Sequence, residues 1–490
     1  MKIKLDKIQN IILVALVLAV FILIIFGNPL RVADELWNFQ NLCKMSNGLK
    51  IYTDANVIIT PIFFYIAHII LSIFGTNILV FRVYNLLIYI AFFSIVYRIF
   101  KNLKIPNQFI LAYIILVIEF IFQVIGAGAN YNILAIVFWL IGLNLYITKK
   151  NNNVNQGILI FLIFFTKQNL GALYAITIII YELYRNKLSK KFIIDQFKKF
   201  FFFLIPTAVL ALFMYIDGNL FDFINFAFGG LFDFGKNNAL LPESGYHPLI
   251  FVLAICLYIF IIIKRDFFKE VINKECFENL TLIFIFAIGM NFVIFPIVNI
   301  AHLIMALPLY LIFLFYLFHI LILESLFGDK KYEKNIKWFC IVILFILLIR
   351  IFANMLFEDD ATFIKDKDSN FFGTYVYDSI LEKSAEVEQY ILEQNSNGID
   401  VMILSYDAAF PMINLKQNHG VYDLLFNGNM GYNGIEKTKQ DIIDRKNTQF
   451  LLVTEEEDLF WQESKEIREF IMENLNSIGE INNYTIYSNN

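Results

Sequence analysis

Apolar runs of about 20 residues recur along the chain between residues 10 and 354. A run of this length can cross the hydrocarbon core of a bilayer as an α-helix. Only 17% of the residues are charged and 59% are hydrophobic, whereas a soluble chain carries about 25% charged residues. We therefore predict a polytopic α-helical membrane protein, located in the cell membrane and surrounded by membrane lipids.

Basic residues at the ends of the runs orient them, because cytoplasmic loops are enriched in lysine and arginine. Lys2, Lys4 and Lys7 predict a cytoplasmic N-terminus. The stretch 157–184 is broken at Lys167, so we predict a hairpin of two short helices with Lys167 at its outer turn. If this hairpin counts as two crossings, the sequence predicts about eleven crossings in all. The other predicted spans are residues 10–26, 79–99, 108–125, 132–148, 198–216, 248–263, 280–298, 303–323 and 337–354.

The predicted first outer loop, residues 28–78, contains an apolar run at 58–75. Residues 79–99 are predicted to run from the outer face to a basic cytoplasmic loop. The run at 58–75 therefore cannot be a simple span, because it would begin and end on the outer side. Pro61 near its start and Gly75 at its end are typical of a bounded helix. We therefore predict an interfacial or re-entrant helix on the outer side of the membrane.

The tail changes in character, because residues 358–490 are polar and charged whereas residues 1–357 are mostly apolar. Residues 401–404 and 450–453 are typical of buried strands. A helical pattern covers 461–475, and 484–487 is compatible with a last strand. We predict a small α/β domain on the extracytoplasmic face, after a transmembrane domain at 1–357. The glycine-rich stretch 428–434 matches neither the P-loop nor the dinucleotide pattern, so we predict a turn-rich surface loop.

Two adjacent carboxylates, Asp34 and Glu35, follow the first predicted span directly. Ionised side chains beside hydrocarbon are costly and often mark function. On the outer face such a group can act as a general base on a hydroxyl, or bind a divalent cation such as Mg²⁺ or Mn²⁺ through oxygen. The structural alternative is that Asp34 caps a helix over residues 35–46.

Four further places offer groups for binding. Lys167 interrupts an apolar stretch, where it either pairs with a phosphate or reaches to the interface as an ordinary lysine. His302 at the outer start of a predicted span, and more weakly His247, can donate to a phosphate oxygen or shuttle a proton. Asn130, Tyr131 and Asn132 lie at a predicted outer turn, where they either bind a sugar or only turn the chain.

These features together resemble the GT-C superfamily of integral-membrane glycosyltransferases, nearest to the protein O-mannosyltransferase and aminoarabinose transferase-like branches. The resemblance covers most of residues 1–325 and depends on the order and spacing of four segments. The chain departs from many members at Thr60-Pro61, where they have two prolines, and at His302, where they have arginine. The four segments are Ala33-Asp34-Glu35, Asn47 to Tyr65, Phe164 to Gln168, and His302 with Pro308.

The resemblance implies transfer of a sugar from a polyprenyl-phosphate donor to an acceptor hydroxyl on the outer face. Asp34 would be the base, or the ligand of a base-assisting metal, and Glu35 would position it. Lys167, His302 and Arg31 would balance the charge of the phosphate. The acceptor is a protein, a glycan, a lipid or a wall polymer, and no nucleic-acid partner is expected. Contacts to the sugar or acceptor would come from Asp54, Tyr52, Asn130, Tyr131 and His247.

Other protein classes remain open. A transporter or flippase would favour ionisable residues within the membrane, of which Glu119 and Arg350 are examples. An O-antigen polymerase or ligase would place its active residues in a late outer loop, here 217–246. A non-catalytic scaffold that presents the tail domain is the third alternative, and in it an Asp34→Asn substitution would be silent.

Overall fold

The computed structural model divides the chain into two compact units, which we call the helical unit and the mixed unit. The helical unit is Met1–Gly27, Asn85–Ala208 and Leu240–Phe357. The mixed unit is Asn28–Tyr84, Val209–Ala239 and Glu358–Asn490. The residues that the structure describes are 11–12, 15–30, 34–118, 131–231, 247–268, 272–294, 300–323, 338–339, 341–346, 348–350, 360–404, 408–425, 428–453 and 464–489.

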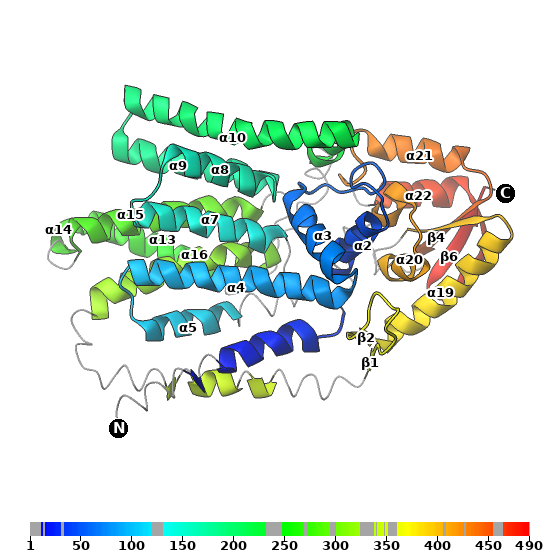
Figure 1. The fold of residues 1–490 in the computed structure, drawn as a ribbon, viewed down its shortest axis with the longest axis horizontal. Coiled ribbons are helices and arrows are strands. Elements are labelled where there is room, and N and C mark those ends of the chain that lie inside the picture. Colours follow the sequence, from blue (N-terminus) through cyan, green and yellow to red (C-terminus); the bar gives the residue numbers. More distant parts are fainter. Residues whose placement is uncertain are drawn as a thin grey trace. The chain divides into compact units, whose positions relative to one another are not determined.

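Helices make up the helical unit, and α7, α8, α9 and α15 lie side by side in it (Figure 1). The boundary between the two units falls inside α4 and α10. The helices are α4 (Ile78–Asn102), α5 (Asn107–Val117), α7 (Tyr131–Ile147), α8 (Asn153–Phe164), α9 (Gln168–Asn186), α10 (Lys190–Asp217), α13 (His247–Ile263), α14 (Arg265–Phe268), α15 (Lys274–Asn291) and α16 (Ile300–Phe318), with short turns η1 (Leu23–Gly27), η4 (Phe292–Ile294) and η5 (His319–Leu323).

Among the described residues, three helices are long and apolar enough to cross a membrane. They are α4, α10 and a helix over His302–Leu321, which contains most of α16. This result is compatible with a membrane protein, as the sequence predicts. The larger number of crossings and their orientation stay predictions, since the other apolar helices are shorter or lie partly outside the described residues.

The predicted hairpin at 157–184 is present as the helices α8 and α9, which are separated only by residues 165–167. Glycine at position 171 permits this close packing, because a Cβ there would overlap with the backbone of Phe164. Lys167 is the residue that precedes α9, as predicted. The local break therefore positions one cation at the junction of two packed helices.

The apolar run at 58–75 forms a helix with the predicted bounds, α3 (Ile62–Phe74). Pro61 precedes it and Gly75 ends it with a φ of 98°, a backbone conformation that glycine adopts without steric cost. With 13 residues, at about 1.5 Å per residue, α3 is too short to span a bilayer of about 30 Å. Its length thus fits the predicted bounded helix.

The mixed unit contains a four-stranded sheet in the order β3-β4-β6-β5. Strand β3 is parallel to β4, while β6 is antiparallel to both of its neighbours. Three strands cover the segments predicted from the sequence, and the edge strand β5 was not predicted. The strands are β3 (Asp400–Leu404), β4 (Thr448–Val453), β5 (Asn476–Ile481) and β6 (Tyr484–Ser488), and a separate antiparallel pair is formed by β1 (Ala361–Phe363) and β2 (Tyr375–Tyr377).

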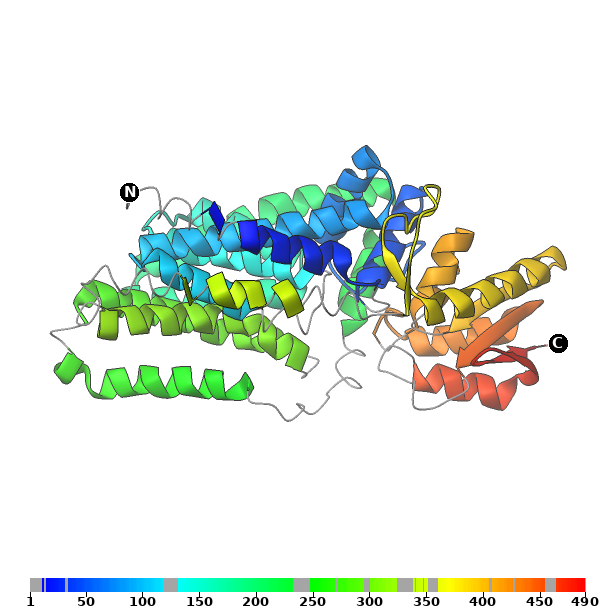
Figure 2. The same cartoon turned by 90° about the horizontal axis from the view of Figure 1, so that it is seen from below.

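Helices cover both faces of this sheet, and Figure 2 shows its strands between α19 and α22. Alternate residues of one strand face opposite ways, so both faces of β3 and β4 are apolar. The remaining elements of the mixed unit are α2 (Asp34–Ser46), α11 (Leu220–Ile224), η3 (Asn225–Gly229), α19 (Asp378–Ser396), α20 (Ala409–Leu415), η6 (Gly420–Leu424), α21 (Gly434–Asp444) and α22 (Lys465–Asn474).

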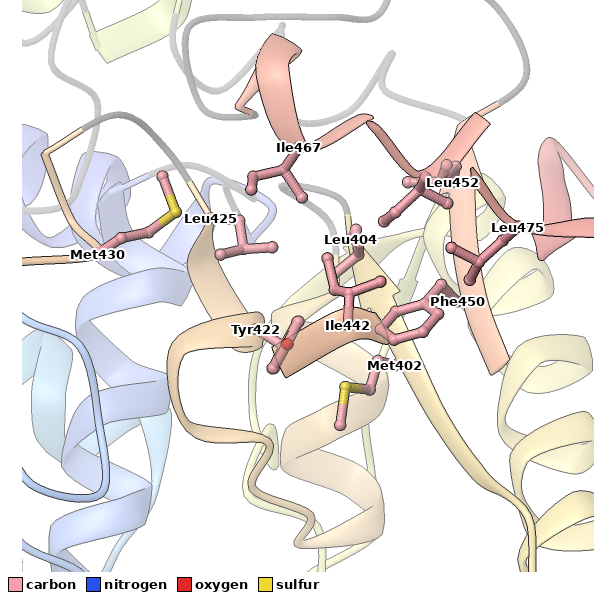
Figure 3. Packing of buried hydrophobic residues seen from close by; sticks show 11 residues of the cluster. Met402, Leu404, Tyr422, Leu425, Met430, Ile442, Phe450, Leu452, Ile467 and Leu475 are labelled. Atoms are coloured by element: carbon pink, nitrogen blue, oxygen red, sulfur yellow. The ribbon is translucent and has the colours of Figure 1, made fainter. Parts of the chain in front are cut away.

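One apolar cluster fills the space between the sheet and the pair α21 and α22 (Figure 3). Phe450 and Leu452 of β4 meet Ile442 and Ile467 there. On the other face, Leu451 and Val453 of the same strand pack with residues of α19 and α20. The α/β tail predicted from two buried apolar runs is therefore present, with a helix–sheet–helix core.

The glycine-rich stretch at 428–434 turns the chain, as predicted, but it does not lie at the surface throughout. Asn429 is fully buried. Its Nδ2 donates to the carbonyl of Asn56 at 3.1 Å, and its Oδ1 accepts from the N–H of Ile58 at 3.0 Å. The stretch is corrected from a surface loop to a buried link within the mixed unit, because this amide satisfies backbone groups of a remote segment.

Candidate functional site

The acidic pair lies in the first turn of α2, where negative charge is favoured by the helix dipole. Glu35 is buried and forms an ion pair with Arg82 of α4. Arg82 Nε donates to Oε1 at 2.7 Å and Nη2 donates to Oε2 at 3.0 Å. Arg82 Nη1 also donates to the carbonyl of Asn28 at 3.0 Å. Glu35 is therefore fixed at both oxygens, whereas the neighbouring Asp34 is half-buried.

This arrangement separates the roles of the two carboxylates. Both oxygens of Glu35 are occupied by a guanidinium group, which competes with a metal ion for the same lone pairs. Among the described residues, no group of three or more His, Cys, Asp or Glu side chains is arranged to hold a metal ion. Glu35 thus anchors the start of α2, and Asp34 is the better candidate for chemistry.

Arg82 is a residue that our sequence interpretation missed. It is the single charged residue between positions 79 and 97, and it is completely buried. A lone arginine in an apolar helix needs an anionic partner. This rule signals a buried carboxylate, although it does not identify Glu35, which lies 47 residues earlier in the chain.

Two predicted contact residues of the first outer loop have structural partners. Tyr52 is buried, and its hydroxyl donates to the carbonyl of Ile59 at 2.7 Å. The Asp54 carboxylate accepts from the N–H of Lys50 at 2.7 Å, and the Asp54 N–H donates to the Lys50 carbonyl at 2.8 Å. These bonds favour a role in shaping the loop over the predicted contacts with sugar or acceptor.

In the helical unit, Lys167 lies beside the first turn of α7. Its ammonium group donates to Oδ1 of Asn132 and lies 5.7 Å from the ring centroid of Tyr131. It is also close enough to His302 of α16 to act on the imidazole electrostatically. The structure therefore brings Lys167 and His302 together with Tyr131 and Asn132 of the predicted outer turn, three places that the sequence singled out separately. We call these four residues the Lys167 cluster.

Three helices begin at the Lys167 cluster. Tyr131 is the first residue of α7, Lys167 precedes α9, and His302 is in the first turn of α16. Helix N-termini carry a partial positive charge and so favour anions. Together with a lysine and a histidine, they form a site suited to a phosphate group.

Three predicted site residues are not placed in full. Arg31 and Asn130 lie outside the described residues. His247 is the first residue of α13, but its side chain is not among those described. Their roles therefore stay predictions.

A scan against protein-family models, a search of curated proteins and a search of solved structures each find no match for this chain.

Proposed function

We propose that this protein is a membrane glycosyltransferase, which moves a sugar from a polyprenyl-phosphate donor to an acceptor hydroxyl on the outer face of the membrane. The observation that supports this proposal most is the Lys167 cluster. A lysine and three helix N-termini offer compensation for the negative charge that grows on a departing phosphate, and the N–H of a neutral histidine can donate a hydrogen bond to it. The resemblance to the GT-C superfamily assigned Lys167 and His302 to that same task.

Asp34 serves in this proposal as the general base. The acceptor oxygen forms a bond to the anomeric carbon while the bond between that carbon and the phosphate oxygen breaks. The proton of the hydroxyl passes to the Asp34 carboxylate, and the electron pair leaves with the polyprenyl phosphate. A single displacement of this kind inverts the anomeric configuration. Glu35 positions Asp34 by anchoring α2 to Arg82.

Transfer of radiolabelled sugar from polyprenyl-phosphate donors in membranes tests the proposal. We expect Asp34→Asn to lower the rate by about 10²- to 10⁴-fold, the usual contribution of a general base. Lys167→Gln should lower it as well, because the departing phosphate loses a cation. Lys149→Gln is the matched control, since Lys149 is an exposed lysine whose ion pair with Glu275 is also exposed.

Equal transfer by wild type and Asp34→Asn, at equal protein level, would remove Asp34 from the mechanism. A lack of transfer by the wild type across several donors would contradict the glycosyltransferase proposal. The Lys167 cluster also suits a flippase that binds lipid phosphates. In that case Lys167→Gln would slow the movement of a fluorescent lipid phosphate across the bilayer, while Asp34→Asn would not.

A further inference from the structure

A groove of about 630 Å³ lies between α8 and α10 of the helical unit. Asn153 and Val154 line it from the start of α8. The α10 side consists of Ile194, Phe197, Lys198, Phe201 and Phe202, whose spacing places them along a single face of the helix.

The two helices that form this groove are held close together at two points. A Cβ on Gly157 of α8 would lie 2.6 Å from the carbonyl oxygen of Lys199 and from Cβ of Phe202. Asn153 Nδ2 donates to Oδ1 of Asp195 at 2.9 Å. Lys199 of α10 also forms a buried ion pair with Glu182, which fixes α10 to α9. The groove is therefore a built feature of the fold.

The groove lies on an apolar surface of α10 whose exposure to water would be unfavourable. Only 6% of the apolar window of α10 is buried within the protein. Phe197 and Phe201 are 70% and 58% exposed. Apolar surface of this extent needs a partner, and α10 is one of the helices suited to cross a membrane. The bilayer supplies that partner, so we expect a lipid acyl chain to lie against the phenylalanine side chains of the groove.

The positive charge of lysines in and near the groove favours anionic lipids over neutral ones. Lys198 lies in the groove, and Lys190 and Lys191 precede it at the start of α10. The nearby Asp195 already accepts a hydrogen bond from Asn153. The positive-inside rule assigns this end of α10 to the cytoplasmic side, where anionic phospholipids are enriched.

We propose that the α8–α10 groove binds an anionic phospholipid of the cytoplasmic leaflet. Its phosphate lies at Lys198, and one acyl chain runs along Phe201 and Phe202. The site is independent of the proposed sugar transfer, because it uses neither Asp34 nor the Lys167 cluster.

Native mass spectrometry of the full-length protein in mild detergent tests this proposal with phosphatidylglycerol and phosphatidylcholine. We expect the wild type to retain phosphatidylglycerol about fivefold better, the effect of one lysine near a membrane surface. Lys198→Gln should remove this preference. Lys264→Gln is the matched control, since Lys264 is an exposed lysine that follows another apolar helix, α13. Val154→Trp should fill the groove and lower the retention of both lipids.

Equal retention of the two lipids by the wild type would overturn the proposal, and this comparison needs no variant to fold. Equal loss of preference in Lys198→Gln and Lys264→Gln would also overturn it, because the effect would then come from overall charge. A third contrary result is displacement of bound phosphatidylglycerol by an equal amount of polyprenyl phosphate, with no reverse displacement. The occupant would then be a polyprenyl lipid.

Discussion

Arg82 and Glu35 form a two-point ion pair with distances of 2.7 and 3.0 Å, and both side chains are buried. The parallel hydrogen bonds fix the direction of the carboxylate as well as its position. Since Glu35 is the second residue of α2, the pair holds the beginning of that helix against α4. Asp34 precedes Glu35 directly, so the same pair restricts its position, as its proposed role of general base requires.

We predict that Arg82→Met lowers the free energy of unfolding by about 3–5 kcal/mol, because removal of one partner leaves a buried charge unpaired. Chemical denaturation of the purified protein in detergent measures the change. Lys50→Met is the control, since the ion pair of Lys50 with Asp217 is partly exposed to solvent and such pairs contribute about 0–1 kcal/mol. Equal effects of the two substitutions would contradict the role of the buried pair.

A second buried ion pair connects α2 to the tail, between Lys44 and Asp423. The two residues are 379 positions apart in the sequence. We predict that Lys44→Met destabilises the protein and exposes the tail to protease, because the Asp423 carboxylate is then buried without its cation. The double variant Lys44→Met/Asp423→Leu should recover much of the loss. If the double variant is as unstable as the single one, the charge pair is not what connects the two segments.

The sequence predicts best those features that are decided locally. Pro61 and Gly75 mark the bounds of α3, and the polar break at Lys167 marks the junction of α8 and α9. The buried strands β3 and β4 are short apolar runs, so they were predicted as well. The edge strand β5 was missed because most of its residues are exposed and carry no apolar alternation.

Long-range partners were not predictable from the same patterns. Nothing near Glu35 indicates that its partner is Arg82, and nothing near Lys44 indicates Asp423. The Lys167 cluster was predicted as separate residues, and its assembly depends on the packing of three helices. Periodicity identifies the elements of a fold, whereas these contacts depend on how remote elements meet.

The close approach of α8 and α9 leads to a prediction about the Lys167 cluster. We expect Gly171→Ala to destabilise the protein by about 1–3 kcal/mol, the typical cost of overpacking, because the added methyl meets the Phe164 backbone. The displaced Lys167 should also raise the donor concentration needed for half-maximal transfer. Ala172→Leu is the control, since Ala172 is exposed on the same helix. If Gly171→Ala leaves the donor concentration for half-maximal transfer unchanged, the contact between α8 and α9 does not affect donor binding.

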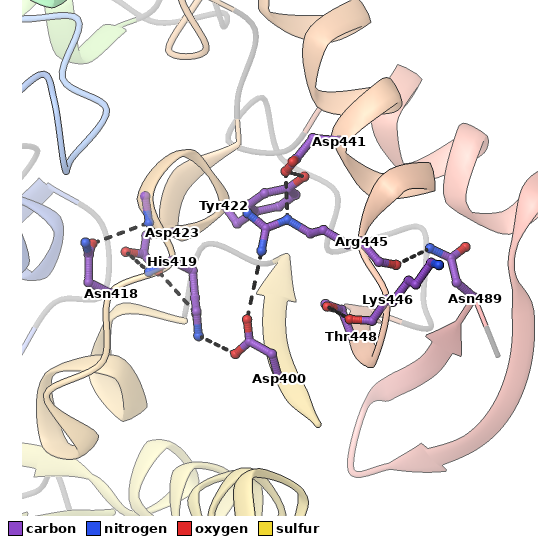
Figure 4. A network of polar contacts seen from close by, with 11 residues as sticks. Asp400, Asn418, His419, Tyr422, Asp423, Asp441, Arg445, Lys446, Thr448 and Asn489 are labelled. Carbon is purple, nitrogen blue, oxygen red and sulfur yellow. Dashed lines mark hydrogen bonds and ion pairs between the residues drawn. The ribbon is translucent and has the colours of Figure 1, made fainter. Parts of the chain in front are cut away.

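The polar network at the start of β3 leads to a prediction about pH. Figure 4 shows His419 between Asp400 and Asp423, with Nε2 at 3.4 Å from Asp400 Oδ1 and Nδ1 at 3.7 Å from Asp423 Oδ1. The hydrogen bond with His419 lowers the pKa of Asp400, helped by the charges of His419 and Arg445 and opposed by burial. Asp423 also forms an ion pair with Lys44, and Arg445 also forms one with Asp441.

A carboxylate whose pKa is lower in the folded state stabilises the fold above its unfolded pKa, which is about 3.9 for aspartate. That stabilisation is lost as the pH falls through the folded value. We therefore expect the wild type to have a higher Tm than Asp400→Asn at pH 6, and the difference to shrink as the pH falls below about 4. Thermal unfolding of the full-length protein in detergent measures it. His419→Asn should reduce the difference, since it removes the main cause of the shift. A Tm difference that stays constant between pH 6 and pH 3 would show that Asp400 acts by packing and not by its charge.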